Sequence, residues 1–352
     1  MRVILGVMKI TVLIPAHQEE KFIGKALAAL RDGTRQPDRV VVACDNCTDD
    51  TAGVVAQYGY ESFNTVGNKD RRAGALNQAM ARVLPDSTAN EIIVAMDADV
   101  YADPDMLANA ERHFQKDPKL TAVSVNFRIL GKGFIGLMET IEYERSRRTT
   151  GRKQGRGACM SGGCSMFRAG ALRRVAFEKG SVYDMRAWAA EDWMLTFDLI
   201  SLGYDKQLKP QDCSASMAGV PTWRGLFQQR QRWSQGNMQV LTAHGLTKYS
   251  ALPWLKLAYL FLTLPVYLLW MALFTLALVD GAGLHIQMWL IAATGLLLFS
   301  RAFTVRKLGP KAVLAAATML PETLYGWWDI SAILSGVWNH VTGKAGQWNA
   351  VR

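Results

Sequence analysis

Cysteine is scarce in this chain of 352 residues, and the five that occur follow no framework spacing. An odd, scattered set indicates reduced thiols in the cytosol and excludes a small disulfide-stabilised fold. Cys44 and Cys47 do form a C-x-x-C pair. Because Cys159, Cys164 and Cys213 supply no second such pair nearby, zinc binding or redox chemistry is the less favoured interpretation.

Several other signals are also missing. The chain has no internal repeat and no low-complexity linker. No G-x-G-x-x-G follows the first predicted strand, which argues against an ordinary dinucleotide-dependent oxidoreductase. Residues 1–20 have the apolar run of a signal peptide, but Lys9 interrupts it and no small-residue cleavage site follows. A buried strand over about Lys9–Ile14 is therefore favoured.

The amino-acid composition divides the chain into two parts. Half of the residues are hydrophobic (50%) and the formal net charge is +10, but residues 1–245 have an ordinary soluble composition and 251–340 do not. In the first part, short apolar runs alternate with segments of helical period, which predicts an α/β domain with a parallel sheet and helices on both faces. Ligands of such sheets bind beyond the carboxyl ends of the strands, where polar residues follow at 15–20, 45–51 and 97–99.

The second part contains two long stretches without charge, Leu257–Val279 and Gly281–Ser300. Each is long enough for the ~20 residues that a helix needs to cross a bilayer. We therefore predict spanning helices over about 254–279 and 284–304, and favour them over buried core helices because neither stretch has a polar face.

Basic residues set the predicted orientation. The connector DGAGLHIQ carries no Lys or Arg, whereas Arg301, Arg306, Lys307 and Lys311 follow the second span. The positive-inside rule then puts the connector outside and the catalytic part, 1–245, in the cytoplasm. Within the membrane region 246–352, the segment 312–340 contains proline, acids and tryptophans, so an interfacial or re-entrant helix is favoured over a third span.

The acidic motif MDAD, residues 96–99, follows a predicted strand. On an extended chain, Asp97 and Asp99 at i and i+2 would project to the same side. Two carboxylates there can hold a divalent cation and a ribose hydroxyl, which suits a nucleotide-diphosphate substrate. Aspartates are also common on surface loops, so the motif alone is weak.

A second acidic pair, Glu191 and Asp192, follows the Gly-rich stretch CMSGGCSMFR and begins a predicted helix. Acids in the first turn stabilise a helix through its dipole, which is the purely structural interpretation. The functional alternative makes one of them a general base that removes a proton from an acceptor hydroxyl.

The stretch FQQRQRWSQGN contains a Q-x-x-R-W motif. On a helix, Gln229 and Arg232 share a face, and the Arg232 fork suits a diphosphate leaving group. Trp233 offers a flat wall on which a sugar ring can stack. The alternative is a basic amphipathic helix lying on anionic lipid.

The basic run RSRRTTGRKQGR, residues 145–156, supports a non-enzymatic alternative, a membrane-surface or nucleic-acid-binding protein. No aromatic residues interleave it and no nucleic-acid motif accompanies it. We therefore expect no nucleic-acid partner, and predict a flexible loop near anionic lipid or phosphates.

Together these motifs resemble the family 2 glycosyltransferases, in particular the membrane-bound, processive-type branch that includes cellulose, chitin and hyaluronan synthases. The resemblance covers about residues 9–240 and, more loosely, the tail. IPAHQEE resembles the first nucleotide loop, CDNCTDDT the family's D-D-G-S-T-D-x-T, and RRAGALN its G-K-A-G-A-L-N. The D-x-D, E-D and Q-x-x-R-W motifs follow in the family's order.

The resemblance implies a GT-A fold, a Rossmann-like nucleotide-diphospho-sugar transferase domain, followed by a helical membrane region. It implies inverting transfer from a nucleotide-diphosphate sugar, with a UDP-sugar as the expected donor, to a saccharide or lipid-linked acceptor. Mg²⁺ or Mn²⁺ is the implied cofactor, and a multi-pass location in the cytoplasmic membrane, among its lipids, the implied setting.

The site residues that the resemblance implies fall into four groups. Ala16, Glu19, Asp45, Arg72 and Asp97 would bind the donor, with Asp97 meeting the ribose and phosphates. Asp99 would hold the metal, Asp192 would be the base with Glu191 beside it, and Gln229, Arg232 and Trp233 would line the acceptor and diphosphate site.

The chain departs from the family pattern in three places. Cys44 replaces the first aspartate of the family's pair, so base recognition is expected to differ. Arg71 and Arg72 replace Gly-Lys, which keeps the cation and loses a flexible glycine. No predicted span precedes the catalytic domain and few follow it, so export of a long polymer by a single chain is not expected.

Overall fold

The computed structural model describes residues 7–155, 160–187, 189–279 and 288–344. Cys159, the end of the basic run at Arg156, and the connector 280–287 lie outside these residues. The chain folds into two compact units. The first is formed by Met1–Val240 together with Asp329–Arg352, and the second by Leu241–Trp328.

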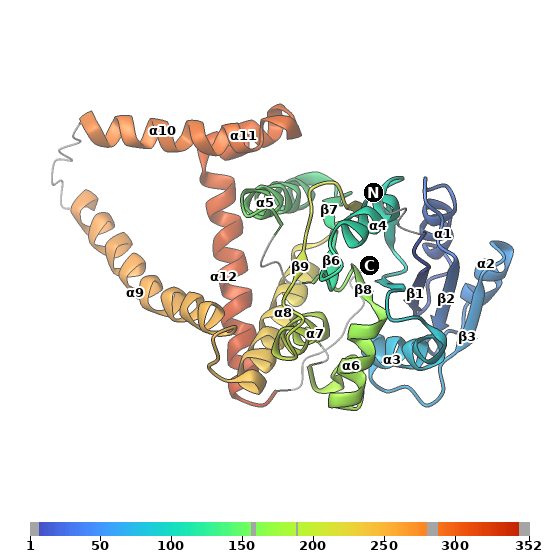
Figure 1. The fold of residues 1–352 in the computed structure, drawn as a ribbon. Helices are drawn as coiled ribbons and strands as arrows, with labels where there is room; N and C mark the ends of the chain where they lie inside the picture. The colour runs from blue at the N-terminus through green and yellow to red at the C-terminus, as the bar shows by residue number, and fades with distance from the viewer. Residues whose placement is uncertain (1–6, 156–159, 188, 280–287, 345–352) are drawn as a thin grey trace. The chain divides into compact units, whose positions relative to one another are not determined.

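The first unit is built on a seven-stranded sheet with the order β3-β2-β1-β4-β8-β6-β9 (Figure 1). Its strands are β1 Ile10–Ala16, β2 Arg39–Cys44, β3 Glu61–Asn64, β4 Ile92–Met96, β6 Ala122–Ser124, β8 Cys164–Arg168 and β9 Gln207–Leu208. The strand predicted over Lys9–Ile14 is thus confirmed as β1.

The direction of the strands confirms only part of the predicted parallel sheet. β1, β2, β3 and β4 run parallel, with Leu13 paired to Val41 on one side and Ala95 on the other. β8 is antiparallel to both β4 and β6, so the sheet is mixed. Sequence periodicity could not reveal this, because a buried antiparallel strand such as CSMFR reads like a buried parallel one.

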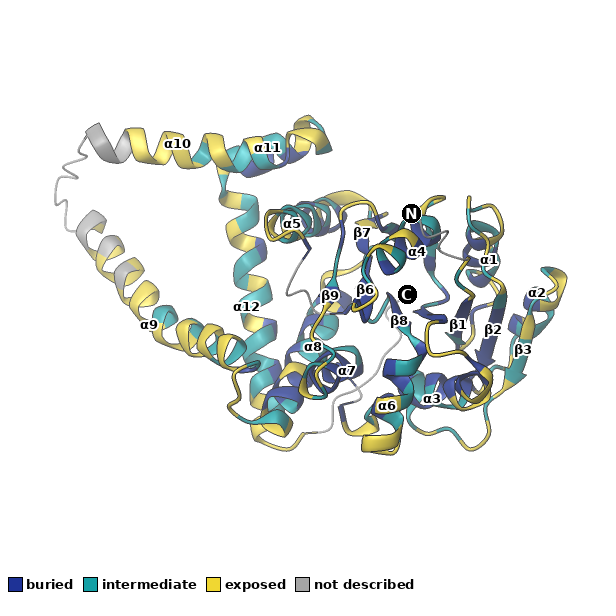
Figure 2. Cartoon of the chain, viewed as in Figure 1, coloured by how far each residue is buried: buried dark blue, intermediate teal, exposed yellow. Residues whose placement is uncertain are grey.

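Helices cover both faces of the sheet, as predicted. α1 Ile23–Arg31, α2 Thr51–Gln57 and α4 Met106–Lys116 pack on one face, and α3 Arg71–Val83, α6 Ala169–Lys179 and α7 Glu191–Ser201 on the other. Two further helices are α5 Gly133–Arg152 and α8 Trp223–His244. Alternation along β1 sends Val12 into one core with Leu27 of α1, and Leu13 into the other with Leu76 of α3. The strands form the buried centre in Figure 2.

A second, three-stranded sheet has the order β5-β10-β7. Its strands are β5 Val100–Ala102, β7 Asn126–Ile129 and β10 Ser214–Met217. Because β5 starts directly after Asp99, this sheet anchors the turn between β4 and β5 from its far side. The turn therefore lies between two hydrogen-bonded strands rather than in a free surface loop.

The last part of the first unit is the end of α12 Leu320–Val341, which packs on α8. Gln231 Nε2 donates to Ser335 Oγ (2.6 Å), and Ser234 Oγ donates to the carbonyl of Ile333 (2.8 Å). Gly336 allows this close approach, because a Cβ there would lie 2.6 Å from Cβ of Ser234 and would overlap the carbonyl of Gln231. The helix that carries the Q-x-x-R-W motif therefore has a fixed neighbour.

The second unit contains α9 Ala251–Val279, α10 Met288–Thr304, α11 Pro310–Thr318 and the beginning of α12. Among the described residues, one stretch, Ala251–Leu273, is long and apolar enough to cross a membrane. The segment predicted as one element over 312–340 is divided between α11 and α12, with Met319 between them at a positive φ of 56°.

The close contact at Gly336 can be tested by Gly336→Ala. We expect this change to lower the free energy of unfolding by ~1–3 kcal/mol, because overpacking costs more than the helix propensity gained from alanine. Gly326→Ala on the same helix is the matched control, since nothing lies within 4 Å of its added Cβ. Thermal unfolding of both purified variants gives the comparison, and equal melting temperatures would contradict the packing described.

Candidate active site

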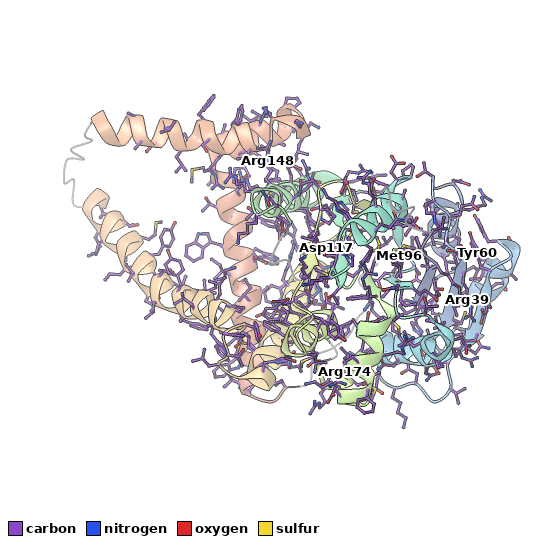
Figure 3. The ribbon with its side chains drawn as sticks, in the orientation of Figure 1. Arg39, Tyr60, Met96, Asp117, Arg148 and Arg174 are labelled. Carbon is purple, nitrogen blue, oxygen red and sulfur yellow. The ribbon has the colours of Figure 1, made fainter. Side chains whose placement is uncertain are left out.

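A cavity of about 1090 Å³ opens at the carboxyl ends of β1, β2 and β4 and is walled by α3, α5, α7 and α8. Met96, labelled in Figure 3, is the last residue of β4 and marks the strand that leads into it. All eleven predicted site residues line this cavity: Ala16, Glu19, Asp45, Arg72, Asp97, Asp99, Glu191, Asp192, Gln229, Arg232 and Trp233. Six separate sequence motifs thus meet in one place, while the role of each residue stays a prediction.

The loops after β1 and β2 form one end of the cavity. The side chain of Asp45 is buried and accepts hydrogen bonds from Thr65 Oγ1 (2.7 Å) and Asn46 Nδ2 (3.0 Å). His17 Nδ1 lies 2.6 Å from the carbonyl oxygen of Asp45, which links the two loops. Buried Glu19 is fixed through its backbone N–H, which donates to Thr51 Oγ1 (2.9 Å). These contacts hold the two loops together and give this end of the cavity a polar wall.

The C-x-x-C pair lies behind this wall. Cys44 ends β2 in the core, and burial raises the pKa of its thiol to about 12. Cys47 donates through its Sγ to the carbonyl of Ala16 (3.3 Å). A thiol that stays protonated is a poor metal ligand and a poor nucleophile, so the geometry favours a packing role for Cys44.

Arg72, at the start of α3, binds both acidic motifs. Its Nε donates to Asp97 Oδ1 (2.6 Å), its Nη1 donates to Glu191 Oε1 (2.8 Å), and its Nη2 contacts the carbonyl of Gly162. Burial is the largest influence and acts to lower the pKa of Arg72, but the two carboxylates hold that pKa well above its usual range. Arg71 takes the left-handed φ of 54° that the family's glycine would favour, at a cost of roughly 1–2 kcal/mol.

The D-x-D motif differs from the predicted extended geometry. Residues 97–99 form a tight turn in which the backbone N–H of Val100 donates to the carbonyl of Asp97 (3.2 Å). The prediction of an extended chain was wrong because β5 begins at Val100 and the chain must reverse to reach it. Both carboxylates nevertheless line the cavity. Burial raises the pKa of Asp97 to about 6, against the lowering effect of Arg72.

Glu191 and Asp192 begin α7, as predicted, but their surroundings differ. Glu191 is buried and paired with Arg72, whereas Asp192 is held by backbone donors. The N–H of Gly162 donates to its Oδ2 (2.6 Å) and that of Trp193 to its Oδ1 (2.8 Å). Desolvation first, and the charge of Glu191 second, raise the pKa of Asp192 to about 6. This is a suitable value for a carboxylate that accepts a proton near neutral pH.

The Q-x-x-R-W motif is helical, as predicted, and lies on α8. Gln229, Arg232 and Trp233 face the cavity from there. The Oε1 atom of Gln229 is buried and has no hydrogen-bond partner within the described part of the chain. Burial lowers the pKa of Arg232, but a guanidinium remains protonated in proteins.

The sequence prediction missed the α5 wall of the cavity. Glu142, Tyr143, Ser146 and Arg147 line it from one face of this helix. Their spacing of one, four and five positions is a helical signal that could have been read from the sequence. It was obscured by the surrounding charge. Arg230, the second residue of QRQRW, also lines the cavity and was not predicted.

The flexible loop predicted over 145–156 is wrong for its first part. Residues 145–152 are the last turns of α5, on which Figure 3 labels Arg148. Glu144 stabilises these turns, because its carboxylate accepts from Arg147 Nε at i+3 (2.8 Å) and from Arg148 Nε at i+4 (3.1 Å). The negative charge of Glu144 thus compensates part of the positive charge of Arg147 and Arg148, two of the arginines that make this run basic.

A further group of possible metal ligands, His113, Asp212 and Cys213, lies outside the cavity lining. Asp212 already pairs with Arg112 Nη2 (2.5 Å) and His113 Nε2 (2.8 Å). Burial raises the pKa of the Cys213 thiol, which disfavours the thiolate that a metal requires. Asp97 and Asp99 are therefore the better candidates for holding a metal.

Comparison with curated proteins shows relatives among polysaccharide synthases. The chain is 27% identical over 241 residues to poly-beta-1,6-N-acetyl-D-glucosamine synthase of Staphylococcus aureus (strain COL), and 26% identical over 240 residues to the synthase of that name from Staphylococcus epidermidis. Each alignment covers 66% of this chain and 55% of the relative. The chain therefore spans about half the length of the curated relatives it matches.

Among solved structures, the chain is similar to mannosyltransferase PcManGT from Pyrobaculum calidifontis, in complex with GDP-Man and Mn²⁺. The TM-score is 0.63 at 21% identity, and the alignment covers 96% of this chain and 88% of the other. This similarity shows the fold, a GT-A α/β domain with a mixed sheet and C-terminal helices.

The family model described as "Glycosyl transferase family 2" matches residues 11–176. These residues contain β1 to β4, the D-x-D turn and β8. The motifs at 191–192 and 229–233 lie beyond the matched residues but line the same cavity. Residues 11–176 of this chain thus match glycosyl transferase family 2, the family that its motifs predicted.

Proposed function

We propose that this protein transfers a sugar from a nucleoside-diphosphate sugar to a hydroxyl of a saccharide or lipid-linked acceptor, with inversion at the anomeric carbon. One observation carries this proposal: donor-type, metal-type, base and acceptor-type residues from six motifs line a single cavity. The names of the relatives make UDP-N-acetylglucosamine the first donor to test, and GDP-mannose the second.

The proposed donor site uses the residues at the strand ends. Ala16, Glu19 and Asp45 would bind the nucleoside, and Arg72 with Asp97 would contact the ribose and phosphates. The Oδ1 atom of Asp97 accepts the hydrogen bond from Arg72 Nε. The Asp97 side chain, which lines the cavity, remains 32% exposed. Carboxylate oxygens are the ligands that Mg²⁺ and Mn²⁺ prefer, so Asp99, beside Asp97, fits the role of metal ligand. The bound cation would offset the charge of the diphosphate.

In the proposed transfer, Asp192 removes the proton from the acceptor hydroxyl as its oxygen forms a bond to the anomeric carbon. The bond between that carbon and the diphosphate oxygen breaks, and its electron pair leaves with the nucleoside diphosphate. Arg232 then stabilises the departing charge through its planar fork of donors. The pairing of Glu191 with Arg72 supports the choice of Asp192 as the base.

A membrane location is part of the proposal. The apolar stretch Ala251–Leu273 supports at least one span, and the exposed side chains of α9 include Leu255, Phe261 and Leu269 (Figure 2). Such a surface is unfavourable in water and favourable in lipid. We propose the multi-pass arrangement with spans over about 254–279 and 284–304, and with the catalytic part in the cytoplasm. The Q-x-x-R-W helix would then work near the membrane surface.

The metal role predicts that Asp99→Asn removes most of the metal-supported turnover while leaving the melting temperature unchanged. Purified protein in detergent should be given a panel of nucleotide sugars, with released nucleoside diphosphate measured with Mn²⁺, with Mg²⁺ and with EDTA. Equal activity of wild type and variant in EDTA and in Mn²⁺ would refute the metal role. A wild type without turnover on any donor would instead support the non-enzymatic alternative.

The base role predicts that Asp192→Asn lowers turnover by ~10²–10⁴-fold, with little change in the affinity for a donor analogue. Because the base must be ionised and its pKa is raised to about 6, wild-type turnover should fall as the pH drops below about 6. Asp97, whose pKa burial also raises to about 6, remains in the variant, so its residual activity should show a weaker dependence on pH in this range. Near-normal turnover of the variant, or loss of donor affinity in parallel with turnover, would exclude the assignment.

The topology predicts that a cysteine at position 283, in a variant without the native cysteines, reacts in intact cells with a membrane-impermeant thiol reagent. Gly283→Cys lies in the connector, and Lys307→Cys on the basic side is the matched control that should react only after lysis. The reverse pattern would invert the proposed orientation, and labelling of both sites in intact cells would remove the second span.

A further inference from the structure

We propose that Arg230 is a positioning residue for the acceptor, which holds the Trp233 ring in place and is itself fixed by Glu142 of α5 and Asp329 of α12. The proposal rests on the proposed transfer, because it assigns Trp233 to acceptor binding. It adds a residue that lies inside the Q-x-x-R-W motif but is not one of the motif's specified positions.

The contact between Arg230 and Trp233 is direct. The guanidinium carbon of Arg230 lies 4.7 Å from the centroid of the Trp233 ring, within the range of a cation–π interaction. The two residues are three positions apart on α8 and therefore share a face of the helix. Both line the cavity. A sugar that stacks on Trp233 must use the part of the ring that Arg230 leaves uncovered, so Arg230 limits where the acceptor can lie.

Arg230 is held from two other helices. Its Nη2 donates to Glu142 Oε2 (2.8 Å), and its Nε lies 3.8 Å from Asp329 Oδ1. The Arg230 side chain is only 9% exposed, whereas those of Glu142 and Asp329 are 38% and 32% exposed, so the arginine end of each ion pair is shielded from bulk water and the carboxylate end is not. Buried guanidinium groups need such partners, because an uncompensated charge in this position would be costly. The orientation of the Trp233 ring is thus tied to α5 and to α12.

Two other side chains of α8 support the same arrangement. Gln231 and Ser234, on either side of Trp233, hydrogen-bond to the end of α12, where Gly336 allows a close approach. Asp329 belongs to the same helix and does not line the cavity. An effect of Asp329 on acceptor use would therefore have to pass through Arg230. Variants of Asp329 therefore test the positioning role of Arg230 without changing a residue that could contact the substrate.

The test uses the full chain in detergent, with UDP-N-acetylglucosamine as donor and a β-1,6-linked N-acetylglucosamine pentasaccharide as acceptor. Arg230→Lys keeps the charge and loses the planar contact, so the acceptor KM should rise about tenfold, within the range of a partly buried cation–π interaction. The donor KM should stay within about twofold, because the donor site lies at the strand ends. Arg224→Lys, an exposed arginine earlier on α8, is the matched control.

Asp329 supplies a second variant that does not touch the cavity. Asp329→Asn should raise the acceptor KM several-fold, and Asp329→Glu should restore it, with the donor KM unchanged in both. Lower melting temperatures without a change in the ratio of the two KM values would overturn the proposal in favour of a purely structural role. If the wild type releases no nucleoside diphosphate from any sugar nucleotide, the proposed function itself fails. If the wild type is active and all these variants match Arg224→Lys, only the role of Arg230 fails.

Discussion

The candidate site depends on the ion pairs and the hydrogen bond that the largely buried guanidinium of Arg72 makes. It joins the turn after β4 through Asp97, the start of α7 through Glu191, and the Gly-rich loop through the carbonyl of Gly162. Without this cation, two carboxylates would face each other in a poorly hydrated space, and burial and repulsion would both oppose their ionisation. A single arginine on α3 therefore allows two acidic motifs, distant in the sequence, to share one cavity.

The same interaction separates the roles of two adjacent acids. Glu191 gives a carboxylate oxygen to Arg72, while Asp192 accepts hydrogen bonds from the backbone of Gly162 and Trp193. Desolvation and the neighbouring charge of Glu191 raise the pKa of Asp192 to about 6. Neighbouring acids with different partners are a recurrent way for a protein to divide structural and catalytic work.

Sequence reasoning reached the site residues because strand ends and helix faces are local properties. The positions of Asp45, Asp97 and Gln229 follow from the apolar runs and helical periods around them, and all three line the cavity. The antiparallel direction of β8 and the turn at 97–99 depend on contacts between distant segments, which periodicity does not encode. The α5 wall was missed for a related reason, since Arg147 is held both by Glu144 on its own helix and by Gln211, which is distant in the sequence.

The contact between α8 and α12 explains why a motif for sugar transfer lies beside an apolar tail in the sequence. The chain leaves the first unit at Val240, inside α8, and returns to it at Asp329, inside α12. Both crossings are therefore made by continuous helices rather than by loops. Within the first unit, these two helices are bound to each other at Gln231, Ser234 and Gly336. The helix that carries the Q-x-x-R-W motif, and with it one wall of the cavity, is thus fixed by the same helix through which the chain returns from the apolar segment.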